Sequence, residues 1–297
     1  MNLLITGAWQ QAENYMEEIR QCGHGIVFLP CEREEMPCAY EWIEGIVGNG
    51  IFLSHPIEKF INLKYIQLVS AGFDRVPMDY IRRHGIKIHN ARGVYSAPMA
   101  EYAVAGVLSL YKNQRFFYEN QKEHTWKKKR DLKELDGQRV CILGCGSVGI
   151  ECAKRFQAFG CRVFGIDTRV VEHESFLSMY DLESIKEVLA QSDIVVITLP
   201  LTKKTKHIFD KKMFDSMKTG AVLVNIARGA LIDTEALIEA LKGHLGGAVL
   251  DVFEEEPLGE NPLWDMDHVV ITPHNSFVGS GNNARMSSVI MKNLEKC

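Results

Sequence analysis

The chain has 297 residues, which is long enough for two domains of ordinary size. Hydrophobic residues make up 46% and charged residues 24%, and the formal net charge is −4. This balance is typical of globular proteins and argues against nucleic acid or an anionic membrane surface as the main partner. No apolar stretch reaches the roughly 18 residues of a membrane span, and the first ten residues lack the features of a signal peptide. We therefore expect a cytoplasmic protein.

The eight cysteines are scattered, with no CxxC pair and no Cys/His spacing typical of a metal site. Cys141, Cys152 and Cys161 fall at predicted core positions, and we interpret them as buried thiols in a reducing compartment. Cys145 lies inside a glycine-rich loop, where it could be oxidised, and we assign it no catalytic role. We predict no metal site.

Residues 1–90 alternate short apolar runs with helix-like pieces, which predicts a parallel sheet covered by helices. The expected strands are Asn2–Ile5, Gly25–Leu29, Gly45–Gly48, Tyr65–Val69 and Ile86–His89, and the clearest helices are Ala12–Cys22 and Met78–His84. The small residues Ser70-Ala71-Gly72 follow the fourth strand, and α/β domains bind ligands at such carboxyl ends. A plain connection to the next helix fits the composition equally well.

The chain crosses between two predicted domains twice. Ser96 as an N-cap and Pro98 in the first turn predict a long apolar helix from Met99 to about Tyr118, followed by a polar connector. The last predicted helix, Arg285–Leu294, has no strand left to cover in the second half, so we expect it to return to the first. The predicted domains are 1–95 with 276–297, and 96–275.

From Arg139 the alternation of strands and helices resumes. Strands are predicted at Arg139–Leu143, Arg162–Ile166, Ile194–Thr198, Ala221–Asn225, Gly247–Leu250 and Val269–Thr272, and helices at Ser147–Phe159, Leu182–Ala190, Lys211–Met217 and Thr234–Leu241. Six strands in this arrangement match a complete dinucleotide-binding fold.

The first of these strands runs into Gly144-Cys145-Gly146-Ser147-Val148-Gly149, and the second delivers Asp167. This order of strand, GxGxxG, helix, strand and acid is typical of a dinucleotide-binding turn. Gly144 would allow the tight turn, Gly146 the approach of backbone to the pyrophosphate, and Gly149 the close packing of helix on strand. Asp167 would accept hydrogen bonds from the ribose hydroxyls.

Polar groups follow three later strands at their carboxyl ends: Arg228 after the fourth, Asp251 and Glu254–Glu256 after the fifth, and His274 after the sixth. Histidine can donate a proton to a carbonyl oxygen, a carboxylate can orient the imidazole, and arginine can hold a substrate carboxylate. Each also has a structural interpretation: a strand-end cap for His274, a solvated turn for the acids, and a stabilising ion pair for Arg228.

These motifs together resemble the D-isomer-specific 2-hydroxyacid dehydrogenase family over nearly the whole chain. The resemblance rests on SAGFD, GCGSVG, LPLT, VNIARGALID, LDVFEEEP and TPHN, which occur in this order. It implies an α/β fold of two doubly wound parallel-sheet domains, a flavodoxin-like substrate domain and a Rossmann NAD-binding domain, with a cleft between them. One departure is that His274 is followed by Asn275-Ser276-Phe277 instead of a small glycine-containing turn.

The resemblance also implies roles for individual residues. Arg228, Glu256 and His274 would be the catalytic residues; among the three glutamates, only the family pattern selects Glu256. The backbone of Ser70, Ala71 and Gly72, with Arg228 and His274, would bind the substrate. NAD would contact the following residues: Gly144, Gly146, Ser147, Val148, Gly149, Asp167, Thr168, Arg169, Leu199, Pro200, Thr205, Ile226, Ala227, Arg228, Asp251 and His274.

The implied activity is NAD-dependent interconversion of a 2-keto acid and the D-2-hydroxy acid, with histidine as acid and base. The alternative is an NAD(H)-responsive co-regulator of the same fold without significant turnover. Family members commonly dimerise through the region of the apolar helix that starts at Met99, so we expect a homodimer.

The first prediction concerns the choice between NAD and NADP. The carboxylate of Asp167 would repel the 2′-phosphate of NADP and accept hydrogen bonds from a free ribose hydroxyl. Arg169, two residues further on, is the complication, since an arginine nearby can hold that phosphate. We expect a higher kcat/KM with NADH than with NADPH, and a smaller ratio in Asp167→Ala. Equal or higher efficiency with NADPH in the parent protein would contradict this prediction.

Overall fold

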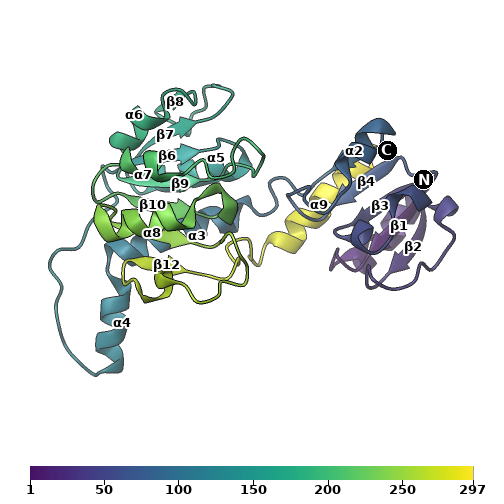
Figure 1. Ribbon diagram of the computed structural model, residues 1–297. Helices are drawn as coiled ribbons and strands as arrows, with labels where there is room; N and C mark the ends of the chain where they lie inside the picture. Colours follow the sequence, from purple (N-terminus) through teal and green to yellow (C-terminus); the bar gives the residue numbers. More distant parts are fainter. Residues whose placement is uncertain (297) are drawn as a thin grey trace. The chain divides into compact units, whose positions relative to one another are not determined.

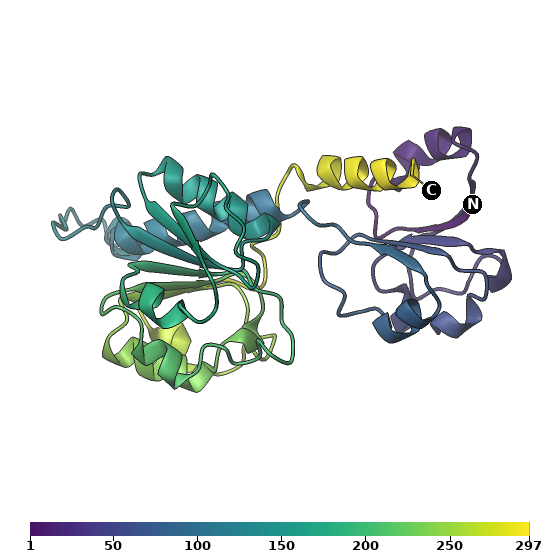
Figure 2. The same cartoon turned by 90° about the horizontal axis from the view of Figure 1, so that it is seen from above.

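The structure, a computed structural model, describes residues 1–296. Contacts within the chain divide it into a first unit, Met1–Tyr95 with Gly279–Cys297, and a second unit, Ser96–Val278. Each unit contains one parallel sheet with helices on both faces (Figures 1 and 2). The predicted fold class of two parallel α/β sheets is thereby confirmed. Cys297, the end of the predicted 276–297 segment, lies outside the described residues.

The first unit has the strand order β2-β1-β3-β4-β5, which is the flavodoxin-like order. All pairings are parallel, with Leu4 of β1 between Val27 and Ile46 of its neighbours. Its elements are β1 (Asn2–Thr6), η1 (Ala12–Tyr15), α1 (Met16–Gln21), β2 (Gly25–Leu29), η2 (Tyr40–Trp42), β3 (Gly45–Gly48), η3 (Ile51–Leu53), η4 (Ile57–Lys59), β4 (Tyr65–Leu68), α2 (Met78–Arg83), β5 (Lys87–His89) and α9 (Asn282–Leu294).

Alternate residues of each strand in the first unit enter two different cores. Leu3 and Ile5 of β1 pack in one cluster with Ile290 of α9, whereas Leu4 packs in the other with Phe60. The continuous apolar strands of this sheet therefore reflect burial on both faces. The C-terminal helix α9 supplies one of these two covers and is therefore part of the first unit's core.

The second unit has the strand order β12-β11-β10-β9-β6-β7-β8, and all pairings between its strands are parallel. Its first strand, β6, lies between β7 and β9, so the chain order reverses there and creates a topological switch point. Its elements are α3 (Ser96–Tyr111), α4 (Gln114–Lys122), β6 (Arg139–Leu143), α5 (Ser147–Ala158), β7 (Arg162–Ile166), β8 (Ser178–Tyr180), α6 (Ile185–Ala190), β9 (Ile194–Ile197), α7 (Lys211–Asp215), β10 (Val222–Asn225), η5 (Gly229–Leu231), α8 (Thr234–Gly243), β11 (Gly247–Leu250), η6 (Pro262–Asp265) and β12 (Val269–Ile271).

The second sheet is also sandwiched between two helical layers, as Figure 2 shows. Val140 and Ile142 of β6 pack in the cluster that contains α3 and α5, and Cys141 and Leu143 pack in the cluster that contains α6, α7 and α8. Because both faces are buried, the sheet holds its strand ends in fixed register. Those ends carry most of the predicted functional residues.

The second unit differs from the prediction in three details. The single helix from Met99 to Tyr118 is broken: α3 ends at Tyr111, Asn113 has a φ of +51°, and α4 follows. Asn adopts this left-handed conformation more readily than most residues, so the helix can turn there. Ser96 is the first residue of α3 and not its N-cap. The short edge strand β8 was missed because three residues carry too little periodicity to predict a strand.

The described cysteines form no disulfide bond. All seven are free thiols, and Cys141, Cys152 and Cys161 are buried. Burial raises the pKa of the Cys161 thiol to about 11. Within residues 1–296, no group of three or more His, Cys, Asp or Glu side chains could hold a metal ion. None of the helices in this part of the chain combines the length and hydropathy needed to cross a membrane.

The second prediction concerns the contact between α3 and β11. A Cβ on Gly106 would lie 2.4 Å from Val249 Cγ1, so Gly106→Ala overpacks this contact. We expect a loss of about 1–3 kcal/mol in the free energy of unfolding, measured by chemical denaturation. Gly243→Ala, at the end of α8, is the matched control because its Cβ would meet nothing within 4 Å. Equal stability of the two variants would show that α3 accommodates the methyl group.

Candidate active site

The glycine-rich loop lies between β6 and α5, next to the end of β9. Gly144 has a φ of +94°, and a Cβ there would lie 2.9 Å from the backbone of Thr198 and Leu199. A Cβ on Gly149 would lie 2.1 Å from the carbonyl oxygen of Gly144, whereas one on Gly146 would meet nothing within 4 Å. Two glycines therefore permit close packing, and the third leaves the N-terminus of α5 accessible, where helix N–H groups favour a phosphate.

The carboxylate of Asp167, directly after β7, is held against this loop. Its Oδ2 accepts a hydrogen bond of 2.7 Å from the backbone N–H of Cys145. Its Oδ1 accepts from the hydroxyl of Thr168 at 3.1 Å and from the N–H of Arg169 at 3.3 Å. Burial, and then the charge of Asp167, raise the pKa of the Cys145 thiol to about 12. Cys145 is therefore a protonated thiol at neutral pH, which disfavours its oxidation.

The segment after β9 forms the other side of the switch point. Thr198 donates a hydrogen bond to the carbonyl oxygen of Leu143, at 3.1 Å. Thr205 donates to the carbonyl oxygen of Pro200 at 2.7 Å, which closes the loop, and Leu199 is buried. The predicted cofactor residues of β6, β7 and β9 thus lie at three adjacent strand ends.

Arg228 is presented by a loop that a buried asparagine organises. Asn225, the last residue of β10, is fully buried; its Oδ1 accepts from the N–H of Ala227 at 3.1 Å, and its Nδ2 donates to the carbonyl oxygen of Arg228 at 3.0 Å. The guanidinium of Arg228 donates to the carbonyl oxygen of Ala227 at 2.7 Å, and Ile226 is buried beneath. The sequence analysis assigned no role to Asn225. A polar residue at the end of an apolar strand is the signal that could have indicated one.

The Arg228 loop packs directly on the acidic segment after β11. A Cβ on Gly229 would lie 1.8 Å from the carbonyl carbon of Phe253 and 2.4 Å from the nitrogen of Glu254. The backbone after Arg228 and the backbone of the acidic segment are therefore in contact, and only glycine permits this approach.

The structure separates the three glutamates of the acidic segment. Glu256 Oε2 lies 2.8 Å from His274 Nδ1, and Glu256 Oε1 accepts from the N–H of Phe253 at 3.0 Å. Glu254 instead contacts His207 Nε2 and accepts hydrogen bonds from the N–H and hydroxyl of Thr234. The side chain of Glu255 is exposed.

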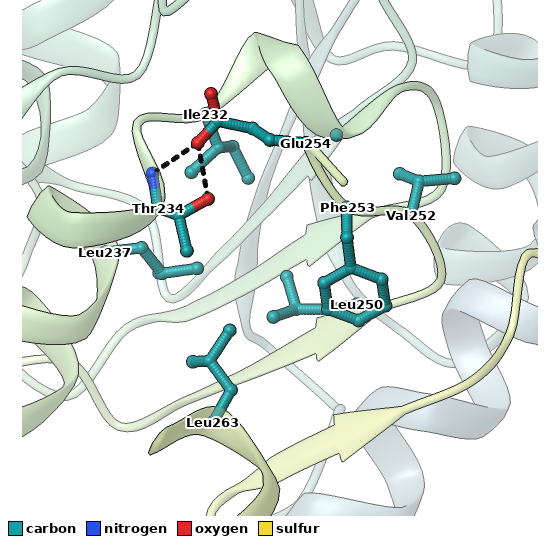
Figure 3. A pocket seen from close by; sticks show the side chains of 9 residues that line it. Ile232, Thr234, Leu237, Leu250, Val252, Phe253, Glu254 and Leu263 are labelled. Atoms are coloured by element: carbon teal, nitrogen blue, oxygen red, sulfur yellow. Dashed lines mark hydrogen bonds between the residues drawn. The ribbon is translucent and has the colours of Figure 1, made fainter. Parts of the chain in front are cut away.

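Glu254 therefore binds Thr234, the first residue of α8, and Figure 3 shows its carboxylate turned toward Thr234. Burial raises the pKa of Glu254, but hydrogen bonds from Thr234 and the contact with His207 outweigh it and lower the pKa below its ordinary value. The neighbouring small pocket is lined by the following residues: Gly229, Ile232, Thr234, Leu237, Leu250, Val252, Phe253, Glu254 and Leu263. This lining is mainly apolar and lacks Glu256 and His274, so the pocket is separate from their pair.

His274 has an unusual backbone conformation, with a φ of +51°. Its N–H donates to the carbonyl oxygen of Asp251 at 2.7 Å, and its Nδ1 faces Glu256, so Nε2 is the ring nitrogen that can meet a ligand. The ring of Phe277 lies edge-on to the imidazole, with centroids 6.1 Å apart. Two side chains and one backbone bond thus define the orientation of the imidazole.

Asp251 lies fully buried at the end of β11. Its Oδ1 accepts from the Thr272 hydroxyl and the Asn275 N–H, both at 2.7 Å, and its Oδ2 accepts from the Ser276 N–H at 2.9 Å. The carboxylate therefore holds together the loop that carries His274.

The predicted substrate turn belongs to the first unit, after β4. Ser70 donates from its hydroxyl to the carbonyl oxygen of Gly72 at 3.1 Å, and Asn90 donates to the carbonyl oxygen of Ala71 at 2.6 Å. These contacts fix the turn at the carboxyl end of the first sheet.

The chain is similar to known dehydrogenases over most of its length. Residues 104–276 match the family model described as D-isomer specific 2-hydroxyacid dehydrogenase, NAD binding domain. A glyoxylate reductase of Thermofilum pendens is 34% identical over 241 residues, covering 78% of this chain and 71% of the relative. A D-lactate dehydrogenase of Treponema pallidum is 28% identical, covering 100% and 96%. A solved structure of D-lactate dehydrogenase from Aquifex aeolicus, complexed with NAD and lactic acid, superposes with a TM-score of 0.78 at 26% identity, covering 99% of this chain and 94% of the other.

The third prediction concerns Glu254 and acid stability. A carboxyl group with a lowered folded-state pKa stabilises the protein above its unfolded-state pKa of about 4.3, and this contribution is lost as the pH falls through the folded value. We expect Glu254→Gln to lower the free energy of unfolding by about 1 kcal/mol at pH 7, and this deficit to shrink below about pH 4. Glu255→Gln is the control. A deficit that stays constant with pH would mean that the charge of Glu254 does not contribute.

Proposed function

Because the chain belongs to the D-isomer specific 2-hydroxyacid dehydrogenase family and is an NAD-dependent oxidoreductase, we propose that it interconverts a small 2-keto acid and its D-2-hydroxy acid, with His274 as acid and base. The observation that carries the proposal is the 2.8 Å contact between His274 Nδ1 and Glu256 Oε2. We assign the substrate-binding role to residues 1–95 with 276–297, and dinucleotide binding to residues 96–275.

The residues around the glycine-rich loop suit NAD. The accessible backbone at Gly146 and the start of α5 would hold the pyrophosphate, and Asp167 would accept hydrogen bonds from the adenosine ribose. When bound, the nicotinamide supplies or accepts the hydride. We assign the remaining contacts to the following residues: Gly144, Ser147, Val148, Gly149, Thr168, Arg169, Leu199, Pro200, Thr205, Ile226, Ala227, Arg228, Asp251 and His274.

Arg228 would hold the keto acid. A guanidinium can donate two parallel hydrogen bonds to a carboxylate or polarise a carbonyl, which a lysine cannot reproduce. The loop geometry set by Asn225 supports this role because it fixes the backbone on both sides of the arginine. In the other unit, the N–H groups of the turn Ser70–Gly72 would bind the substrate carboxylate.

His274 would move the proton. With Nδ1 facing Glu256, Nε2 would donate a proton to the carbonyl oxygen in reduction and take it back in oxidation. Glu256 would stabilise the charged imidazole and prevent the ring from rotating. The co-regulator alternative is not favoured, because the named relatives are enzymes.

We also propose a homodimer that uses α4 and the segment that follows it. Tyr118 is 59% exposed and Trp126 is 95% exposed, and Figure 1 shows α4 extending away from the second sheet. Large exposed aromatic side chains are typical of interfaces between proteins. The fourth prediction is a dimeric mass by light scattering at micromolar concentration, reduced toward the monomer by Trp126→Ser. A monomeric parent protein would refute it.

The fifth prediction tests His274 as the acid and base. We expect His274→Ala to lower kcat by roughly 10²–10⁴-fold with a panel of 2-keto acids, the usual scale for a general acid. NADH affinity, measured by fluorescence titration, should change little. Glu256→Gln should lower kcat as well, whereas its neighbour Glu255→Gln should not. Near-parental turnover of His274→Ala would move the chemistry to another residue.

A further inference from the structure

A chain of hydrogen bonds connects helix α3 to the loop that carries His274. Tyr102, in α3, donates from its hydroxyl to Thr272 Oγ1, just after β12. Thr272 Oγ1 in turn donates to Asp251 Oδ1 at 2.7 Å. The bonds run in one direction, from a phenol through an alcohol to a carboxylate, and such chains strengthen each of their members.

Asp251 accepts hydrogen bonds from the backbone N–H groups of three consecutive residues. Its carboxylate accepts from the N–H groups of Asn275 and Ser276, and its carbonyl oxygen accepts from the N–H of His274. His274 has a φ of +51°, a left-handed conformation that is unfavourable for a residue with a side chain and persists only where its surroundings impose it. The bonds to Asp251 therefore determine the backbone position from which the imidazole of His274 extends.

The hydroxyl of Tyr102 can act as a donor at neutral pH. Burial raises the pKa of Tyr102 above its ordinary value; the charge of Asp251 acts in the same direction, and the hydrogen bond to Thr272 acts against both. The hydroxyl thus stays protonated, and its bond fixes the direction in which Thr272 donates.

We propose that Tyr102 is a positioning residue for His274, acting through Thr272 and Asp251. The proposal rests on the proposed function, in which His274 moves the proton. Tyr102 sets the Thr272 hydroxyl toward Asp251, Asp251 sets the backbone of residues 274–276, and this backbone sets the distance from His274 to Glu256. A small displacement of a proton donor reduces the rate strongly, because transfer requires hydrogen-bond distance to the reacting oxygen.

The same helix offers a matched control. Tyr111, also in α3, is buried and packs under the ammonium of Lys133, at 5.4 Å from the ring centroid. Its hydroxyl takes no part in the chain of bonds to Asp251. Tyr111→Phe therefore removes the same hydroxyl group from the same helix and leaves the hydrogen bonds between Tyr102, Thr272 and Asp251 intact.

The experiment compares Tyr102→Phe and Tyr111→Phe in the parent protein and in His274→Ala, with kcat from steady-state NADH oxidation. We expect Tyr102→Phe to lower kcat about 3- to 10-fold in the parent, as for a lost hydrogen bond, and to have no further effect in His274→Ala. This lack of additivity is the signature of action through His274. Tyr111→Phe should leave kcat unchanged in both.

If thermal unfolding shows that Tyr102→Phe does not fold, a second pair of variants, at Thr272, tests the same proposal. Thr272→Val removes the hydroxyl that bonds to Tyr102 and Asp251, so its kcat should fall as in Tyr102→Phe. Thr272→Ser keeps the hydroxyl and should retain parental kcat. Parental kcat in Tyr102→Phe, or an equal loss in the His274→Ala background, would overturn the proposal. Parental turnover of His274→Ala alone would instead refute the proposed function.

Discussion

The second unit depends on the parallel pairing of its strands. Parallel strands place all their carboxyl ends at one edge of the sheet, so residues far apart in the sequence meet there. Asp167, Arg228 and His274 follow β7, β10 and β12, and Asp251 follows β11. Burial of both faces fixes the register of these strands. The register in turn fixes the positions of the functional residues along the strand direction. The site is therefore a product of the core beneath it.

Close backbone contacts then bring the loops together. Gly149 permits α5 to pack against the turn at Gly144, and Gly229 permits the Arg228 loop to lie on the backbone of Phe253. A methyl group at either glycine would meet backbone atoms, which cannot move aside as a flexible side chain can. The glycines thus contribute to the chemistry by setting distances and not by touching a ligand.

Buried polar side chains complete the arrangement. Asn225 and Asp251 are fully buried, and each makes hydrogen bonds to the backbone of a nearby loop. Leaving such groups unpaired would cost free energy, so the loops are held in the conformations that pair them. This is why the conformation of His274, unfavourable by itself, is maintained.

The sequence by itself determined the parallel α/β class, most strand positions, the glycine-rich loop and the strand-end locations of Arg228 and His274, because apolar periodicity and glycine spacing are local signals. The residue types alone left Glu254, Glu255 and Glu256 equivalent, and the family resemblance selected Glu256. The structure shows Glu256 facing His274, while Glu254 binds Thr234 at the start of α8. The break at Asn113 and the anchoring role of Asp251 also emerged only in three dimensions. Each of these depends on which groups lie within hydrogen-bond distance after folding, and no local pattern encodes that distance.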